Sequence, residues 1–292
     1  MSLRRAAFVF TRLLFATSSS PSIIISGSGS SSGCAAALSI SSRFPAPPPV
    51  MEPGTLPPLV LASKSPTRQL ILREMGFSFL CIPADIDEKA IGDRLRDKPE
   101  ELVLEIGRAK AAKVLAELEK QQQQQQQEEE EEEGGVGGGQ QGQRQSPLPP
   151  LPLEPGTLLL AGDQVVVYDG AIREKPTDAA EAREFIRSYT RLPCATVGSC
   201  VVVDPRTGRR AEGVDATSVA FSAIPDDVVD RLVEEGDVLH CAGGLMIEHP
   251  LVQPYIVSVD GSIDSVMGLS KALVQRLVAE VTGLDGESPL SA

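Results

Sequence analysis

Apolar residues recur along this chain with two different spacings, which together predict alternating strands and helices. Short, continuous apolar runs predict buried strands, and they lie at 59–62, 158–161, 165–168, 196–203 and 255–259. Apolar residues with helical periodicity occupy 66–75, 99–119, 178–190, 226–235 and 270–282. The segment 204–208, Asp-Pro-Arg-Thr-Gly, lies between two β-rich runs and predicts a hairpin turn. Strands that alternate with helices are typical of an α/β fold.

A low-complexity stretch interrupts this pattern after the second helix. Glutamines fill 121–127, six glutamates follow to Glu133, and Gly-rich and Pro-rich sequence continues to Pro155. Such a composition buries too little apolar surface to offset the entropy of ordering. We therefore expect a disordered insertion at 121–155 inside a single folded domain that spans 56–284.

Residues 1–51 have the composition of an organelle transit peptide, with several arginines, many serines and no Asp or Glu. Their apolar pieces are too short to span a bilayer. A presequence would direct the protein to a plastid or a mitochondrion. An equally open interpretation is a disordered extension without an address, with Met51 as the true start and the protein in the cytoplasm.

Composition and charge narrow the classes of partner. The 292 residues are 41% hydrophobic, enough for a buried core, and carry a net charge of −13. Such a charge repels nucleic acid and anionic membranes, so we expect neither as a partner. The odd count of five cysteines, without CxxC spacing, indicates reduced thiols in an intracellular protein. With only two histidines, carboxylates are the expected metal ligands.

A candidate anion site lies where the first predicted strand meets the first predicted helix, in Ala62-Ser-Lys-Ser-Pro-Thr-Arg68. Ser65 is placed as the N-cap and Pro66 at the first helical position. Free backbone N–H groups at this end bind anions, and Ser63 and Arg68 add hydroxyl and cationic donors. Taken alone, an ordinary capped helix explains the same residues.

Carboxylates and lysines at three other places are candidates for the chemistry. Glu88, in Asp87-Glu88, precedes the helix that carries Lys110, and Asp163 follows an apolar strand at Gly162. A carboxylate delivered by a buried strand is costly unless it binds a metal or acts as a base. Lys175 stands before a helix and could reach a phosphate. For each of these residues a solvated or turn position is the alternative.

Glu248 stands at the end of an apolar, Gly-containing segment between His240 and His249. The two glycines of this segment indicate close backbone approach or a positive φ. The alternative is a turn with a solvated glutamate. We expect both histidines to be structural or exposed, not ligands.

Taken in order, these sites resemble the Maf-like nucleoside triphosphate pyrophosphatases. The resemblance covers about 59–284 and is interrupted only by the insertion. It is carried by seven motifs, namely Ser63-Lys-Ser-Pro-Thr-Arg68, Asp87-Glu88, Arg108-Ala-Lys110-Ala, Gly162-Asp-Gln-Val165, Lys175-Pro176, Cys241-Ala-Gly243 and Val266-Met-Gly-Leu269.

The resemblance implies an enzyme with a mixed, twisted sheet in two lobes and a nucleotide-binding cleft, in a family that is often homodimeric. It implies hydrolysis of the bond between the α and β phosphates with a divalent cation (Mg²⁺, Mn²⁺ or Co²⁺). The implied roles are a general base and metal ligand for Asp163, a metal or catalytic carboxylate for Glu88, and phosphate binding for the remaining matched residues, Ser63, Ser65, Arg68, Lys110 and Lys175.

The implied substrate is 7-methyl-GTP, because the chain is more similar to the subgroup associated with that nucleotide. The subgroup associated with dTTP and UTP differs at Thr67, Gln164, Cys241 and Glu248, and it is the alternative. A carboxylate such as Glu248 suits the cationic 7-methylguanine and its N1–H and N2–H₂ donors. An answer of another class is a nucleotide-binding regulator without catalysis, although the retention of both carboxylates and both lysines favours the enzyme.

Overall fold

The structure, a computed structural model, describes residues 56–134 and 153–283, with side chains described as far as Gln127 in the first range. The expected presequence at 1–51 and residues 135–152 of the expected insertion lie outside these ranges. None of the described helices combines the length and the apolar composition needed to cross a membrane.

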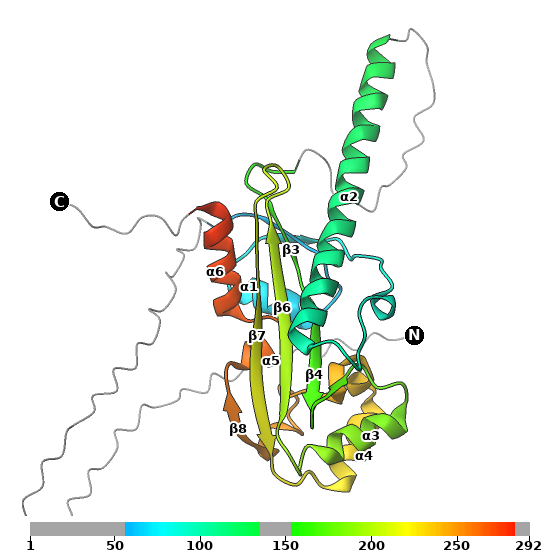
Figure 1. The fold of residues 1–292 in the computed structure, drawn as a ribbon, viewed down its shortest axis with the longest axis vertical. Helices are drawn as coiled ribbons and strands as arrows, with labels where there is room; N and C mark the ends of the chain where they lie inside the picture. The colour runs from blue at the N-terminus through cyan, green and yellow to red at the C-terminus, as the bar shows by residue number, and fades with distance from the viewer. Residues whose placement is uncertain (1–55, 135–152, 284–292) are drawn as a thin grey trace, which may run out of the picture. The chain divides into compact units, whose positions relative to one another are not determined.

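A mixed sheet of eight strands forms the centre of the described part (Figure 1). Strand β1 pairs in parallel with β2 and β3, and all the remaining pairs are antiparallel. The strands are β1 (Leu59–Leu61), β2 (Phe79–Cys81), β3 (Leu158–Ala161), β4 (Gln164–Tyr168), β5 (Ala171–Arg173), β6 (Cys194–Val203), β7 (Arg210–Phe221) and β8 (Ile256–Asp260).

Two strands share one edge of β6, and this divides the sheet into two lobes. Along its whole length β6 pairs with β7. The other edge is taken by β3 opposite residues 201–203 and by β4 opposite residues 195–198. The chain passes from β3 to β4 through Gly162 and Asp163, next to Ser199. A Cβ on Gly162 would lie 2.2 Å from the Ser199 carbonyl oxygen, so only glycine fits this junction.

The first lobe contains β1, β2, β3 and the adjoining parts of β6 and β7 between two helical layers. Successive residues of a strand face opposite sides of the sheet. Leu59 and Leu61 pack with α1 (Pro66–Glu74) and α6 (Lys271–Thr282), whereas Val60 and Ala62 pack with α2 (Pro99–Gly134). Because β1 and β3 are buried on both faces, they have continuous apolar sequences.

The second lobe has its own core, formed by β4, the other halves of β6 and β7, and two helices. These helices are α3 (Ala179–Ser188) and α4 (Asp226–Glu235). Val166, Ile186 and Val229 belong to this core. The connecting elements are η1 (Glu88–Ala90), η2 (Asp237–His240), η3 (Ala242–Gly244), η4 (Gln253–Tyr255) and α5 (Ile263–Val266). Separate cores in the two lobes of one sheet confirm the expected two-lobed α/β architecture.

The predicted elements are present with shifted ends, and α2 requires a correction. We expected this helix to end at 119 and disorder to begin at Gln121, but α2 continues through the glutamines and glutamates to Gly134. Gln and Glu have good intrinsic helix propensity, and extending a helix already nucleated by packed residues such as Val103 and Val114 costs little. The short strands β2 and β5 were not predicted.

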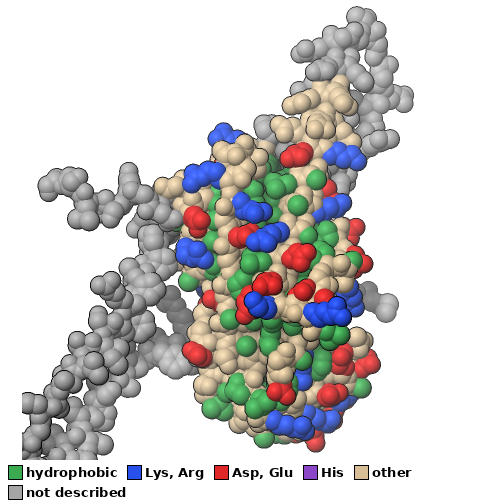
Figure 2. Space-filling model, in the orientation of Figure 1, with side chains coloured by type: hydrophobic (Ala, Val, Ile, Leu, Met, Phe, Trp, Pro, Cys, Tyr) green, Lys and Arg blue, Asp and Glu red, His purple; other side chains and the backbone are tan. Residues whose placement is uncertain are grey.

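Charges of both signs are interspersed on the face where α2 and β7 lie (Figure 2). There Arg108 pairs with Glu212, and Arg210 also contacts Glu212 at 3.6 Å. On this face the side chains therefore form no continuous field of one sign.

Candidate active site

Three of the residues expected to carry chemistry meet at the junction of the two lobes. Lys110, from α2, places its Nζ 2.7 Å from Asp163 Oδ1 and 2.8 Å from Glu88 Oε1. The side chains of Lys110 and Asp163 are 9% and 12% exposed, and that of Glu88 is 48% exposed. A buried ammonium thus joins one buried and one accessible carboxylate, at the point where the sheet edge opens between β3 and β4.

Ser199 fixes the backbone of Asp163, and the sequence did not single it out. The Asp163 N–H donates to Ser199 Oγ at 3.0 Å, and the Ser199 N–H donates to the Asp163 carbonyl at 2.8 Å. The Ser199 hydroxyl in turn donates to the Val103 carbonyl of α2 at 2.5 Å. Because Val103 and Lys110 belong to the same helix, Ser199 sets the position of Asp163 relative to its lysine partner.

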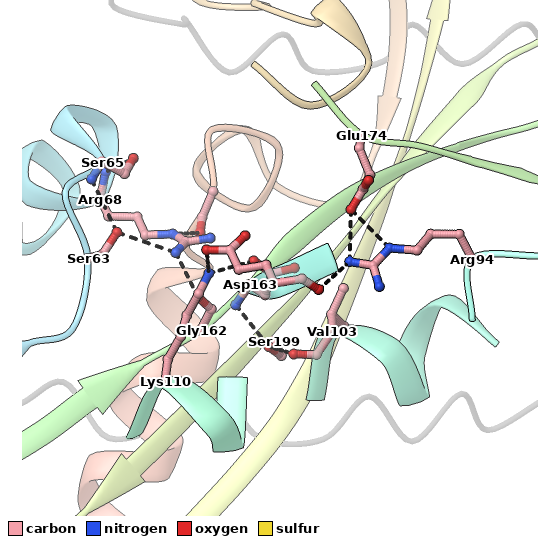
Figure 3. Close-up of polar contacts among 12 residues, drawn as sticks. Ser63, Ser65, Arg68, Arg94, Val103, Lys110, Gly162, Asp163, Glu174 and Ser199 are labelled. Carbon is pink, nitrogen blue, oxygen red and sulfur yellow. Dashed lines mark hydrogen bonds and ion pairs between the residues drawn. The ribbon is translucent and has the colours of Figure 1, made fainter. Parts of the chain in front are cut away.

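The loop before α1 adjoins this junction, as expected for an anion site (Figure 3). Ser65 caps the helix by accepting from the Arg68 N–H at 3.4 Å, and Ser63 Oγ accepts from the Ser65 N–H at 3.1 Å. Arg68 is 9% exposed and donates to the carbonyls of Gly162 at 2.8 Å and Gly268 at 3.0 Å. Its guanidinium therefore joins the loop to the β3–β4 junction and brings a buried positive charge there.

The segment 265–268 acts as a backbone partner for the site. The Gly268 carbonyl accepts a hydrogen bond from Arg68, and the Ser265 carbonyl accepts one from Gln164 Nε2 at 2.7 Å. Gly268 has φ of +120°, a region that side chains strongly disfavour. The Met-Gly-Leu motif thus has a structural role here, which its sequence alone did not indicate.

Lys175 and Glu248 lie in a second group, around the Cys241 thiol. Burial raises the pKa of Cys241 to about 11, with further raising by Glu248 and Asp237 and lowering by Lys175. Burial also raises the pKa of Glu248 above its ordinary value, opposed by a backbone hydrogen bond and by His249. Both expected substrate contacts therefore act on the same thiol, Glu248 from a half-buried position and Lys175 from an exposed one.

The histidines have the structural or exposed positions expected of them. His249 Nε2 lies 3.0 Å from Glu235 Oε2, and His249 Nδ1 accepts from the Leu251 N–H at 3.2 Å. Both ring nitrogens are thus engaged in holding the segment next to Glu248, while His240 is exposed.

The residues that fit a divalent metal are Glu88 and Asp163. In the described part of the chain, no group of three or more Asp, Glu, His or Cys side chains is arranged so that it could hold a metal ion. Their carboxylate oxygens nevertheless both lie within hydrogen-bonding distance of one ammonium nitrogen, so they are close enough to share a cation. Mg²⁺ uses this kind of donor set, with one or two carboxylates and the remaining positions filled by water and substrate phosphates.

A mixed sheet with a helix start, two buried basic side chains and two carboxylates gathered at the junction of its lobes defines the class, an α/β protein with the kinds of group that bind phosphorylated ligands. A sequence model described as "Maf-like protein" matches residues 58–281. The chain therefore belongs to the Maf-like protein family.

Curated relatives include a "7-methyl-GTP pyrophosphatase" of Dictyostelium discoideum, 34% identical over 77% of this chain and 98% of that protein. A "nucleoside triphosphate pyrophosphatase" of Salinispora tropica is 34% identical over 79% and 89% of the two chains. A "dTTP/UTP pyrophosphatase" of Anaeromyxobacter dehalogenans is 31% identical over 76% and 93%. A solved dITP/XTP pyrophosphatase of Mycobacterium abscessus aligns with a TM-score of 0.29 and 13% identity, too low to support an argument.

Proposed function

We propose that this chain is a nucleoside triphosphate pyrophosphatase that hydrolyses the bond between the α and β phosphates, with 7-methyl-GTP as its preferred substrate. The observation that carries the proposal is Lys110, buried between Asp163 and Glu88 beside the loop of Ser63 and Ser65. An isolated buried charge is costly, so a lysine and two carboxylates kept together at a lobe junction support a catalytic role.

The phosphates are expected to bind on the side of Ser63, Ser65 and Lys110. The start of α1 presents the positive end of the helix dipole, although Pro66 has no N–H and the Arg68 N–H is already bound by Ser65. Arg68 adds positive charge, and its described bonds are to the carbonyls of Gly162 and Gly268 and to Ser63 Oγ. We therefore assign it to shaping the phosphate loop as well as to attracting the anion. Lys175 would contact the triphosphate from the other lobe.

The reaction is an in-line displacement at the α phosphorus. Asp163 accepts a proton from a water molecule, a new P–O bond forms to that water oxygen, and the bond to the bridging oxygen breaks. The electron pair leaves with diphosphate, whose charge is stabilised by Lys110 and Lys175. A divalent cation held by Glu88 and Asp163 would supply further neutralisation of the phosphate oxygens.

Glu248 is the residue that we assign to the base. Its carboxylate can accept from the N1–H and N2–H₂ groups of guanine, and its charge favours the cationic 7-methylguanine over neutral bases. The burial that raises its pKa also strengthens such a contact, because charge-assisted hydrogen bonds are worth more where water is excluded. The Dictyostelium discoideum relative, with the substrate in its name, supports the same choice.

The test is diphosphate release from 7-methyl-GTP, GTP, UTP and dTTP with Mg²⁺ or Mn²⁺. The highest kcat/KM is expected for 7-methyl-GTP. A preference for UTP or dTTP would overturn the choice of substrate and favour the alternative that the Anaeromyxobacter dehalogenans relative suggests. Tight nucleotide binding without turnover of any triphosphate would instead identify a regulator.

A further inference from the structure

We propose that Arg94 is a positioning residue that holds the Glu88 loop against the segment of Lys175 and so sets the spacing between the two groups of the active site. The proposal rests on the proposed function, because it concerns the geometry of that same site. Neither the sequence motifs nor the family resemblance singled out Arg94.

The contacts of Arg94 reach both sides of the site. Its Nε and one terminal nitrogen lie 3.1 and 3.0 Å from Glu174 Oε1. The same terminal nitrogen donates to the carbonyl of Glu88 at 2.7 Å, and the other donates to the carbonyl of Ile91. One guanidinium therefore binds the main-chain carbonyl of Glu88. It also binds the side chain of Glu174, the residue that precedes Lys175 (Figure 3).

The loop that presents Arg94 is itself well fixed. Asp93 Oδ1 accepts from the Leu95 N–H at 2.9 Å, and the Asp97 N–H donates to the Asp93 carbonyl at 2.8 Å. Gly92 provides the left-handed turn before it, with φ of +70°. The Arg94 side chain is only 19% exposed, so its contact with Glu174 is better shielded from solvent than an ordinary surface ion pair.

The partner side is fixed as well. The Glu174 carbonyl accepts from the Gly243 N–H at 2.8 Å, and the Gly243 carbonyl accepts from the Tyr189 hydroxyl at 2.6 Å. Tyr189 is buried in the core of the second lobe. The contacts thus run from the Glu88 loop through Arg94 and Glu174 into that core, and Lys175 follows directly on the anchored residue.

The several N–H donors of a planar guanidinium explain why arginine occupies this position. Guanidinium can bind a carboxylate and main-chain carbonyls at the same time in a fixed plane, whereas a lysine offers a single nitrogen. Loss of these contacts would let Glu88 and Lys175 shift relative to each other. Small displacements of reacting groups can lower a rate by about a hundredfold.

The experiment compares Arg94→Ala and Arg94→Lys with Arg96→Ala, using the triphosphate that the wild type turns over best. Arg96 lies on the same loop, is 86% exposed and contacts only Asp93 among the ion pairs of the described residues, so it matches the change in charge and in loop sequence. We expect Arg94→Ala to lower kcat and to raise KM, reducing kcat/KM by about ten- to a hundredfold. Arg94→Lys should recover part of the loss, and Arg96→Ala should stay within about twofold of the wild type, as expected for an exposed pair.

Glu174→Gln tests whether Arg94 acts through its partner. The single variant should change kcat and KM in the same direction as Arg94→Ala, and combining the two should cost little more than Arg94→Ala alone. A purely stabilising arginine would instead reduce the active fraction and leave KM unchanged. Unchanged KM, or equal effects of Arg94→Ala and Arg96→Ala, would overturn the proposal.

Hydrogen exchange of the nucleotide-free protein separates this proposal from the proposed function. Amides of 88–96 and of 174–177 should exchange faster in Arg94→Ala than in Arg96→Ala, whether or not any triphosphate is hydrolysed. Equal exchange in the two variants would remove the link between the segments. An inactive wild type with the expected exchange pattern would reject the enzyme and retain the link.

Discussion

Lys110→Met removes a buried ammonium and leaves the carboxylates of Asp163 and Glu88 facing each other. Methionine keeps a similar length and an apolar stem, so the change isolates the charge from the packing of α2. In the present structure the ammonium lies within 2.8 Å of both carboxylates. The variant therefore tests whether this triad is an electrostatically coupled unit.

The size of the stability loss in Lys110→Met follows from the solvent exposure of the two carboxylates that remain. Removing one partner of a buried pair destabilises a protein by about 3–5 kcal/mol, because the other charge stays buried and unpaired. Asp163 meets that condition with a side chain that is 12% exposed, whereas Glu88, 48% exposed, can turn to water. We therefore expect a loss near the lower limit, about 3 kcal/mol, a substantial part of a typical total stability of about 5–15 kcal/mol.

Denaturant unfolding at neutral pH measures this loss, with Lys113→Met as the matched control. Lys113 lies on the same helix, is 42% exposed and pairs only with Glu117 in the described ion pairs, so its removal should cost less than about 1 kcal/mol. Equal stability of the two variants would refute the reasoning.

Divalent cations should restore part of the stability of Lys110→Met. If Glu88 and Asp163 hold the metal, a concentration of one hundred times the dissociation constant stabilises the variant by about 2.7 kcal/mol. The same addition to a variant that also carries Asp163→Asn should have much less effect. Equal stabilisation of both variants would place the metal elsewhere.

Four further predictions concern activity, selectivity, stability and the insertion. Asp163→Asn should lower kcat by at least about a hundredfold with an unchanged circular dichroism spectrum, because the amide cannot accept the proton of water; near-normal kcat would remove Asp163 from the mechanism. Glu248→Gln should lower kcat/KM for 7-methyl-GTP about ten- to a hundredfold more than for UTP, as a mismatched buried pair does; equal losses would assign Glu248 to phosphate chemistry. The same variant should have a higher Tm than the wild type at neutral pH. Because the pKa of Glu248 is raised in the folded state, its contribution to stability is present at low pH and is lost as the pH rises through that pKa. A Tm below that of the wild type would contradict this reasoning. Deletion of 135–152 should leave Tm and turnover nearly unchanged, because the candidate site lies within 56–127 and 153–283; a large loss of either would contradict this.

Local sequence patterns were sufficient for most elements of the fold, and they singled out three residues that the structure brings together, Glu88, Lys110 and Asp163. Continuous apolar runs indicated β1 and β3 because both faces of these strands are buried. Asp163, which follows the apolar run 158–161 and Gly162, was singled out as a candidate because a carboxylate at the end of a buried strand is costly. The helix start at Ser65 and Pro66 was predicted from its capping residues, which act locally.

What the sequence could not supply depends on pairing between distant segments. Nothing local indicates that β3 and β4 share one edge of β6, and this register creates the opening at Asp163. Ser199 is one of two polar side chains in the mostly apolar strand β6, so its two bonds to Asp163 became evident only with the register. The signal available was its polarity at a position where the strand is fully buried.

Arg94 and the end of α2 show two other limits. Arg94 lies in a charged loop where its pairing with Glu174, eighty positions away, has no local signature. The glutamine and glutamate tract reads as low complexity, yet the residues that precede it pack tightly and extend the helix. In both cases tertiary contacts decided a feature that composition alone left open.

The most direct test of the central claim is the fate of 7-methyl-GTP in ¹⁸O-labelled water. Attack at the α phosphorus predicts equimolar 7-methyl-GMP and diphosphate, with the label only in the monophosphate. Asp163→Asn should form both products at least about a hundredfold more slowly. Release of single phosphate, or label in the diphosphate, would contradict cleavage between the α and β phosphates by the site at Asp163.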